Sequence, residues 1–154
     1  VLISYRTSPT AEGLQWLSPE QTAGKEKPFL FSQAQALNAR TMAPLQDTPA
    51  VRMTYSATLR VPDGLLPLMS ASQGAKDENG EYRFEMPQPI PSYLLAIAVG
   101  DLKFKPINDH IGVYAEDYIL EAAAEENWAR SRQLIYQNSQ GLQPMLNPPF
   151  HHQQ

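Results

Sequence analysis

The chain has 154 residues and a formal net charge of −4, a size that corresponds to one domain with a sizeable core. It contains no cysteine, no basic cluster that would neutralise phosphates and no apolar run of membrane-spanning length, which argues against a disulfide framework, nucleic-acid binding and membrane insertion. Its 14 prolines disfavour a helical bundle, because each removes a backbone donor and fixes φ. Antiparallel strands and loops tolerate them better.

The first residues, Val1-Leu2-Ile3-Ser4-Tyr5, have the apolar character of a strand already under way. We therefore expect the natural protein to carry residues before Val1. No charged stretch followed by an apolar stretch is visible at this end, so the sequence shows no signal peptide. We expect a cytoplasmic location, with the periplasm left open.

The clearest periodic pattern predicts a half-buried β-strand over residues 51–61, because apolar and polar side chains alternate there. The apolar positions are Val51, Met53, Tyr55, Ala57, Leu59 and Val61. Residues 62–64 then make a turn, and residues 66–72 are expected to form a second apolar strand.

A hairpin is predicted at Asp77-Glu78-Asn79-Gly80, because Asn-Gly readily adopts the positive φ that tight turns require. Residues 81–86 would form the return strand, which the proline-rich residues 87–91 are expected to interrupt. Residues 93–99 are nearly all apolar and predict a buried strand.

Two shorter strands are predicted over residues 102–106 and 111–115, and a helix is predicted over residues 118–136. The expected fold is therefore mainly β, with a partial antiparallel, saddle-like sheet domain over residues 1–108. Residues 109–137 would add a short strand and one helix of a second domain. Residues 138–154 are polar and rich in turn-forming residues, and we expect a disordered or divergent tail.

Eight short motifs occur in order over about the first hundred residues. They are Thr7-Ser8-Pro9, Leu14-Gln15-Trp16-Leu17, Pro19-Glu20-Gln21-Thr22, Phe31-Ser32-Gln33-Ala34-Gln35-Ala36, Gln46-Asp47-Thr48-Pro49, Leu68-Met69-Ser70-Ala71, Pro91-Ser92-Tyr93-Leu94 and Val99-Gly100-Asp101-Leu102. Together they resemble the leukotriene A4 hydrolase and aminopeptidase B group of zinc aminopeptidases. The resemblance covers roughly residues 1–125 and fades after Glu126.

The resemblance implies that the chain holds the second half of an N-terminal saddle-shaped β domain and the start of a thermolysin-like catalytic domain. It also implies a parent enzyme that uses zinc to remove N-terminal residues from peptides. The family binds zinc through His-Glu-x-x-His and a further Glu, yet none of His110, His151 and His152 is followed by Glu-x-x-His. The chain alone is therefore expected to hold neither zinc nor catalytic residues, which leaves open whether it is itself an enzyme.

The resemblance also implies a substrate-binding element at Gln33-Ala34-Gln35-Ala36. Gln33 and Gln35 would contact the N-terminus and backbone of the peptide, while Ala34 and Ala36 would line the cleft floor. A carboxamide suits this role because it offers both a donor and an acceptor without adding charge. The same pattern also fits two surface glutamines beside the start of a short helix. The family commonly has Ile-His after this element, where this chain has Leu37-Asn38.

Other candidates have plainer interpretations. Trp16 is expected to pack in the core, although it could support the cleft. Asp47 is expected to cap backbone donors in its own turn. The carboxylates at Glu116, Asp117, Glu121, Glu125 and Glu126 are expected to form a solvated helix face rather than a metal site.

Two functions follow from these observations. The first is a part of a zinc aminopeptidase whose partner is the peptide N-terminus, with no nucleic-acid or membrane partner. The alternative is a stand-alone, non-catalytic β-rich module that binds peptides or proteins along an exposed sheet edge. Exposed strand edges would also favour self-association.

Overall fold

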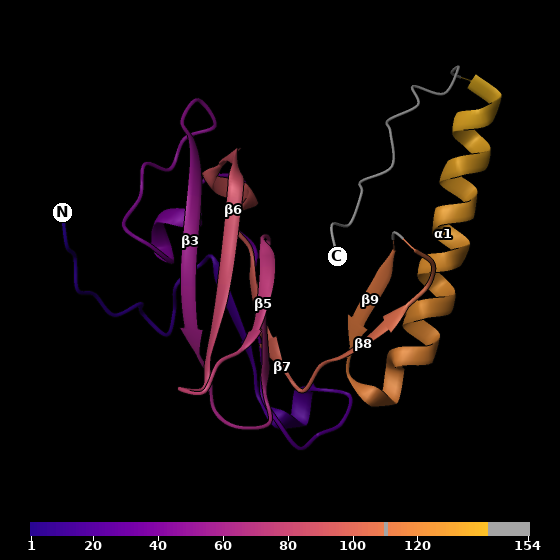
Figure 1. Cartoon of the computed structure of the whole chain (residues 1–154), viewed down its shortest axis with the longest axis horizontal. Helices are drawn as coiled ribbons and strands as arrows, with labels where there is room; N and C mark the ends of the chain where they lie inside the picture. The colour runs from indigo at the N-terminus through magenta and orange to yellow at the C-terminus, as the bar shows by residue number, and fades with distance from the viewer. Residues whose placement is uncertain (110, 142–154) are drawn as a thin grey trace.

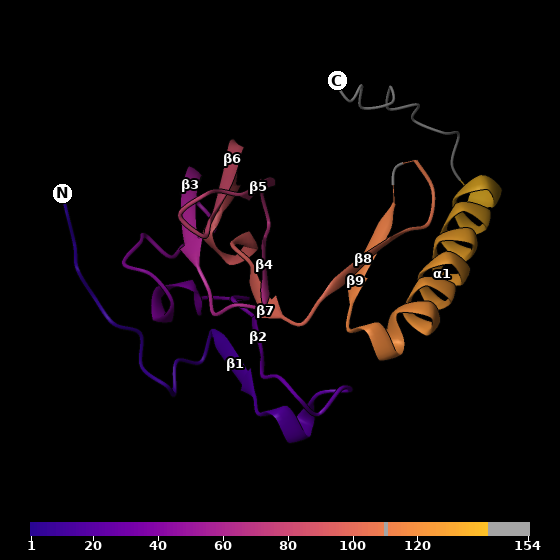
Figure 2. The same cartoon turned by 60° about the horizontal axis from the view of Figure 1, so that its bottom comes forward.

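The computed structural model describes residues 1–109 and 111–141, with side chains described up to residue 130. Its strands form a four-stranded, a three-stranded and a two-stranded sheet, all antiparallel, and one helix follows them (Figures 1 and 2). The predicted class, mainly antiparallel β with a C-terminal helix, is therefore confirmed. No helix of the described part is both long and apolar enough to cross a membrane.

The four-stranded sheet has the order β1-β2-β7-β4 and the three-stranded sheet the order β3-β6-β5, while β8 and β9 form a hairpin. Their bounds are β1 Leu14–Leu17, β2 Phe29–Ser32, β3 Arg52–Arg60, β4 Leu66–Met69, β5 Ser72–Lys76, β6 Glu81–Pro91, β7 Ile97–Gly100, β8 Lys103–Pro106 and β9 Gly112–Ala115. Short 3-10 turns lie at η1 Pro19–Gln21, η2 Ala39–Thr41, η3 Ser92–Leu94 and η4 Asp117–Ile119, and helix α1 spans Leu120–Gly141.

Strand β3 confirms the alternation seen in the sequence. Its odd-numbered residues are half-buried and its even-numbered residues are exposed. It pairs with β6 from Arg52 opposite Pro91 to Arg60 opposite Glu81, where the two charged side chains lie 2.6 Å apart. The period of two thus places the apolar side of β3 toward the interior of the molecule.

The hairpin between β5 and β6 is also confirmed. Gly80 has φ +79° and donates its N–H to the Asp77 carbonyl over 3.0 Å. The Asp77 carboxylate accepts from the backbone N–H groups of Asn79 and Glu81, each over 2.9 Å. These contacts satisfy the turn without help from the rest of the fold, which is why the local sequence predicts it.

The proline-rich residues 87–91 do not interrupt β6, contrary to the prediction, since the strand continues to Pro91. Strand β5 pairs with β6 only between Tyr82 and Glu85, so among the described residues the proline-rich half of β6 has no strand neighbour on that side that would need its N–H donors. On the other side a register shift between Met53 and Tyr55 of β3 takes up the irregular stretch.

Three further strand predictions are wrong in extent. The strand expected over residues 66–72 ends at Met69 as β4, and Ser72 already begins β5, which belongs to a different sheet. The segment 93–99 begins as the 3-10 turn η3, and only its last part joins β7. Residues 1–5 have no regular structure, and Val1 and Leu2 are fully exposed, because no neighbouring strand pairs with them in the described chain.

The strands predicted near residues 102–106 and 111–115 are confirmed as β8 and β9, and the predicted helix is α1. The helix continues to Gly141, into the predicted tail, while residues 142–154 lie outside the described residues. This unit meets the β1–β2 connection through Glu116, whose carboxylate accepts from the Ala23 N–H over 2.7 Å. A Cβ at Gly24 would lie 2.8 Å from the Tyr118 ring, so the two units are in close contact there.

Candidate functional site

The predicted substrate-binding element, residues 33–36, forms the turn between β2 and η2. Ala34 is only 3% exposed and packs in a small core with Ala39 and Met42. Gln33, Gln35 and Ala36 are exposed. The turn is therefore anchored through one alanine, and its other three residues face solvent.

Hydrogen bonds fix the shape of this turn. The Gln33 N–H donates to the Gly13 carbonyl and the Asn38 N–H donates to the Ala34 carbonyl, each over 2.9 Å. The Gln33 side-chain oxygen accepts from the Gln35 N–H over 3.4 Å, and the peptide bond after Gln35 is cis. The Gln35 carboxamide has no hydrogen-bond partner among the described residues, so it is available to a ligand.

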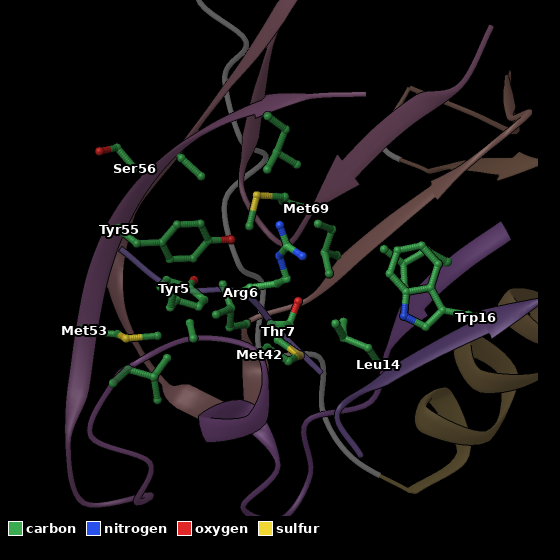
Figure 3. A pocket seen from close by; sticks show the side chains of 17 residues that line it. Tyr5, Arg6, Thr7, Leu14, Trp16, Met42, Met53, Tyr55, Ser56 and Met69 are labelled. Carbon is green, nitrogen blue, oxygen red and sulfur yellow. The ribbon is translucent and has the colours of Figure 1, made fainter. Parts of the chain in front are cut away.

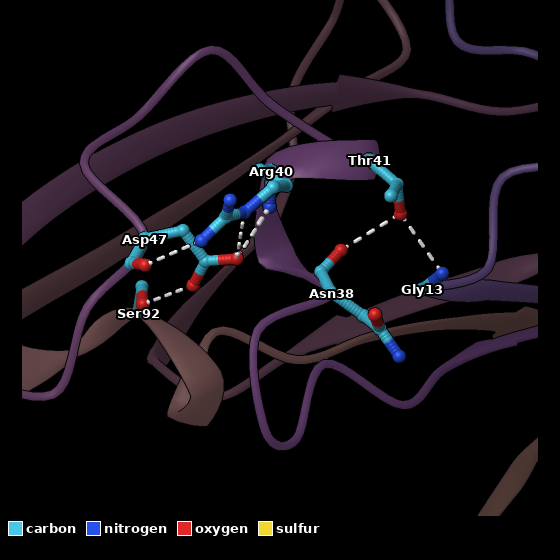
Figure 4. Close-up of polar contacts among 6 residues, drawn as sticks. All are labelled: Gly13, Asn38, Arg40, Thr41, Asp47 and Ser92. Carbon is cyan, nitrogen blue, oxygen red and sulfur yellow. Dashed lines mark hydrogen bonds and ion pairs between the residues drawn. The ribbon is translucent and has the colours of Figure 1, made fainter.

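Gly13 holds both ends of the turn. Besides accepting from Gln33, it donates its own N–H to the Thr41 hydroxyl over 2.9 Å. That hydroxyl in turn donates to the Asn38 carbonyl over 2.7 Å (Figure 4). These hydrogen bonds connect the residue before β1 to η2. They leave no room for a side chain at Gly13, because a Cβ there would lie 2.6 Å from the Asn38 carbonyl oxygen.

Replacing Gly13 by alanine is expected to lower the free energy of unfolding by about 1–3 kcal/mol, because the added methyl group overpacks this contact. Urea denaturation of the variant measures the loss. Gly74→Ala is the matched control, since a Cβ there would have its nearest neighbour at 3.4 Å. Equal stability of the two variants would show that the contact at Gly13 is not tight.

A buried carboxylate lies behind the turn. The Asp47 side chain is 1% exposed, and one of its oxygens accepts from the Arg40 backbone N–H over 3.0 Å and from the Arg40 guanidinium over 3.2 Å. Its other oxygen accepts from the Ser92 hydroxyl over 2.5 Å (Figure 4). Asp47 thus connects η2 to η3. The prediction that it caps donors of its own turn is wrong, because the donors bonded to its carboxylate belong to Arg40 and Ser92.

The environment of Asp47 shifts its pKa in opposing directions. Burial raises the pKa, while the hydrogen bonds from Ser92 and Arg40 and the charge of Arg40 lower it. The bonds and the charge win, and the pKa lies below its ordinary value of 3.8. The carboxylate is therefore ionised at neutral pH and holds its three donors in place.

An apolar groove of about 760 Å³ lies between the four-stranded and the three-stranded sheet (Figure 3). The lining includes Leu14, Trp16, Met53, Tyr55 and Met69, and Arg6 is the one charged residue among the described residues that line it. Trp16 is 57% exposed, which corrects the expectation that it packs in the core. Gln33 and Gln35 do not line this groove, although Ala34 and the groove share Met42 as a neighbour.

Residues 2–94 match the Peptidase M1 N-terminal domain family, which is more than half of the chain. The chain belongs to this family. The resemblance inferred from the eight motifs is therefore confirmed.

Relatives of this M1 chain include aminopeptidase B from Homo sapiens, which is 48% identical over 126 residues that make up 82% of the chain and 19% of the relative. Leukotriene A-4 hydrolase from Xenopus laevis is 42% identical over 142 residues, or 88% of the chain and 23% of the relative. The chain thus spans about a fifth of the length of these curated relatives.

Solved structures agree with this assignment. Native leukotriene A4 hydrolase from Saccharomyces cerevisiae superposes with a TM-score of 0.70 at 38% identity, covering 78% of the M1 chain and 18% of that structure. The yeast enzyme in complex with bestatin gives 0.73 at 35% identity, covering 87% and 21%. Both the fold and the sequence of the M1 chain therefore match about a fifth of a larger protein.

Four of the five acidic residues near α1, namely Glu116, Asp117, Glu121 and Glu126, are engaged in ion pairs or hydrogen bonds. Asp117 pairs with Lys103 over 2.8 Å and so raises the pKa of that lysine, Glu121 pairs with Lys105, and Glu126 pairs with Arg130 over 2.6 Å. Within residues 1–109 and 111–141 no three His, Cys, Asp or Glu side chains gather closely enough to hold a metal ion. All three histidines lie outside the described residues.

Sequence reasoning missed the residues that support the turn of the M1 chain. Gly13, Arg40, Thr41 and Ser92 come from three separate segments, since Arg40 and Thr41 both lie in η2, and they meet only in the folded chain. Ser92 lies within one of the eight motifs, Pro91-Ser92-Tyr93-Leu94, but only the structure shows that its hydroxyl is buried and therefore needs a partner. Nothing in the local pattern of Gly13 distinguishes it from a turn glycine.

Proposed function

We propose that this chain is the part of a zinc-dependent M1 aminopeptidase that binds the free N-terminus of the peptide substrate. The observation that carries the proposal is the turn at residues 33–36, which is anchored by buried Ala34 and exposes Gln33 and Gln35. Its relatives include aminopeptidases about five times longer than the aligned part. The rest of such an enzyme would supply the opposite wall of the cleft.

Two carboxamides on one turn suit a peptide N-terminus. An ammonium group carries three donors, and the amide oxygens of Gln33 and Gln35 are acceptors for them. The amide N–H groups can donate to the first peptide carbonyl, which positions the backbone as well as the amine. Because both side chains are neutral, the site would recognise the amine through the geometry of its hydrogen bonds. It would add no charged side chain beside the zinc.

In the proposed enzyme the zinc is held by residues outside this chain. The described residues offer no donor set that suits it, since zinc sites need three or four His, Cys or carboxylate ligands that converge on one point. When bound, zinc supplies an activated water for hydrolysis. The part played by this chain is to hold and orient the amine end of the peptide.

A non-catalytic peptide-binding module is the second candidate. Its supporting observation is the free edge of β3, which lies beside the apolar groove and has no strand neighbour on that side among the described residues. An extended peptide could pair with such an edge. The two functions differ in what the surrounding coding sequence contains, because only the aminopeptidase requires a His-Glu-x-x-His segment downstream.

The chain alone, supplied with zinc, is expected to show no hydrolysis of an aminoacyl-arylamide, whereas the product of the longer reading frame should hydrolyse it in a chelator-sensitive manner. Release of the arylamine is the measurement. Robust, chelator-sensitive turnover by the 154-residue chain itself would contradict the proposed division of labour. A reading frame that ends at Gln154 without a zinc motif would leave the binding module as the function.

A further inference from the structure

Asn38 precedes η2 but does not cap it. An asparagine at this position normally has an extended backbone, and its side-chain oxygen then accepts from a backbone N–H of the first turn. Asn38 instead has φ −97° and ψ −3°, which is the helical region, and its side chain makes no capping bond. The usual local reason for an asparagine at the start of a helical turn therefore does not apply here.

The Asn38 carboxamide is uncommitted and accessible. It has no hydrogen-bond partner among the described residues, and the residue is only half-buried. The Thr41 hydroxyl bonds the backbone carbonyl of Asn38, and the carboxamide points away from that hydroxyl (Figure 4). A ligand can therefore reach both the donor and the acceptor of this side chain.

The Asn38 backbone, in contrast, is fixed on both sides. Its N–H donates to the Ala34 carbonyl over 2.9 Å, and its carbonyl accepts from the Thr41 N–H over 3.1 Å and from the Thr41 hydroxyl over 2.7 Å. These bonds hold the position from which the side chain starts, without using the carboxamide itself. Such pre-organisation lowers the cost of ordering a group when a ligand binds.

The same bonds place Asn38 beside the proposed amine-binding turn. Ala34 lies between Gln33 and Gln35 in the sequence, and the bond from its carbonyl to the Asn38 N–H brings Asn38 next to it. Three neutral amide side chains thus start from backbone positions grouped around one buried alanine. Of the three, only the Gln33 side chain makes a hydrogen bond within the described chain.

The spacing suits an extended peptide. The bond from the Asn38 N–H to the Ala34 carbonyl spans four residues, and a turn of this kind has about the length of one helical turn, about 5.4 Å. Two residues of an extended peptide cover a similar distance, about 6.6 Å. The backbone groups of alternate residues in such a peptide point to the same side. When the first residue faces the glutamines, the next N–H on that side is the one of the third residue.

We propose that Asn38 is a third substrate-binding residue of this turn, whose side-chain oxygen accepts from the N–H of the third residue of the bound peptide. The inference rests on the proposed function, because it takes the peptide to lie along this turn with its amine at Gln33 and Gln35. It adds that the site also recognises the backbone beyond the bond that is cleaved.

Two matched substrates of the product of the longer reading frame test the proposal. A dipeptide N-methylamide carries the required N–H, and the dipeptide methyl ester of the same sequence has an oxygen in its place. A hydrogen bond between neutral groups corresponds to about a fivefold change in kcat/KM. We therefore expect the wild type to prefer the N-methylamide about fivefold. Asn38→Ala should lose this preference by losing activity on the N-methylamide alone.

Further variants separate this role from a structural one. Asn38→Asp keeps both the shape and the acceptor, so it should keep the preference. Gln88→Ala, at an exposed glutamine on β6, should behave as the wild type. Should Asn38→Ala not fold, Asn38→Leu replaces it, because leucine keeps the branched shape and has no acceptor. A wild type without preference, or an equal loss on both substrates in the variant that lacks the acceptor, would overturn the proposal.

The double replacement of Gln33 and Gln35 by alanine distinguishes this inference from the proposed function. Both substrates carry the free amine, so that variant should lose activity on both of them equally. Such a loss, together with an Asn38→Ala enzyme that still prefers the N-methylamide, would overturn the role of Asn38 and leave amine binding by the glutamines in place. Full activity of the double variant, with the preference lost in Asn38→Ala, would refute amine binding and support Asn38.

Discussion

Replacing both Gln33 and Gln35 by alanine in the intact enzyme is expected to lower kcat/KM for an unblocked peptide by about a hundredfold or more. Each glutamine would contribute a hydrogen bond to a charged ammonium, and such bonds are worth about 1.5–3 kcal/mol each. Two of them therefore correspond to at least two powers of ten in the rate constant. Steady-state kinetics on a dipeptide substrate measures the loss.

The control for this experiment uses both the enzyme and the substrate. Gln15 and Gln88 are also exposed glutamines, and their double replacement by alanine should leave kcat/KM unchanged. An N-acetylated substrate lacks the ammonium, so it should be a poor substrate of the wild type, and the Gln33/Gln35 double variant should lose little further activity on it. An equal loss on blocked and unblocked substrates would refute an amine-binding role.

Replacing Asp47 by alanine is expected to lower the free energy of unfolding by about 2–4 kcal/mol. The change leaves the buried Ser92 hydroxyl and the Arg40 N–H without their acceptor, and unmet buried donors are costly. Denaturant titration measures the effect. Asp63→Ala is the matched control, because the Asp63 side chain is 99% exposed and its pairing with Lys76 is worth little. Similar losses for both variants would contradict the structural role of Asp47.

The pH dependence of stability should reflect the same carboxylate. Because the pKa of Asp47 is lower in the folded chain, its contribution is fully present above its ordinary value of 3.8 and is lost as the pH falls through the folded pKa. Asp47→Asn should therefore reduce the loss of stability below about pH 4 relative to wild type. Identical acid profiles for the two proteins would show that the Asp47 pKa is not depressed.

The parts of the fold that the sequence predicts well are those that local chemistry determines. The alternation along β3 and the turn at Asn79-Gly80 need no distant partner, and both appear as predicted. The errors concern positions where a distant neighbour decides. Whether Pro87–Pro91 can lie in a strand depends on how far β5 extends, and whether residues 66–72 form one strand depends on which sheet each half joins.

The candidate site was also predicted only in part. The family resemblance indicated residues 33–36, but neither the pattern nor the resemblance indicated which groups hold them. Gly13, Thr41 and Asp47 form hydrogen bonds to residues that lie seven to forty-five positions away in the sequence. Such bonds produce no periodic pattern in the sequence. Trp16 shows the converse error, since a residue type that is usually buried lines an open groove here.

The most direct measurement of the central claim is a crystal structure of the longer protein with a peptide or peptide analogue bound beside the zinc. We expect the carboxamides of Gln33 and Gln35 to lie within hydrogen-bond distance, about 3 Å, of the terminal amine or the first peptide carbonyl. A ligand whose amine is held by other residues, with both glutamines facing solvent, would contradict the account.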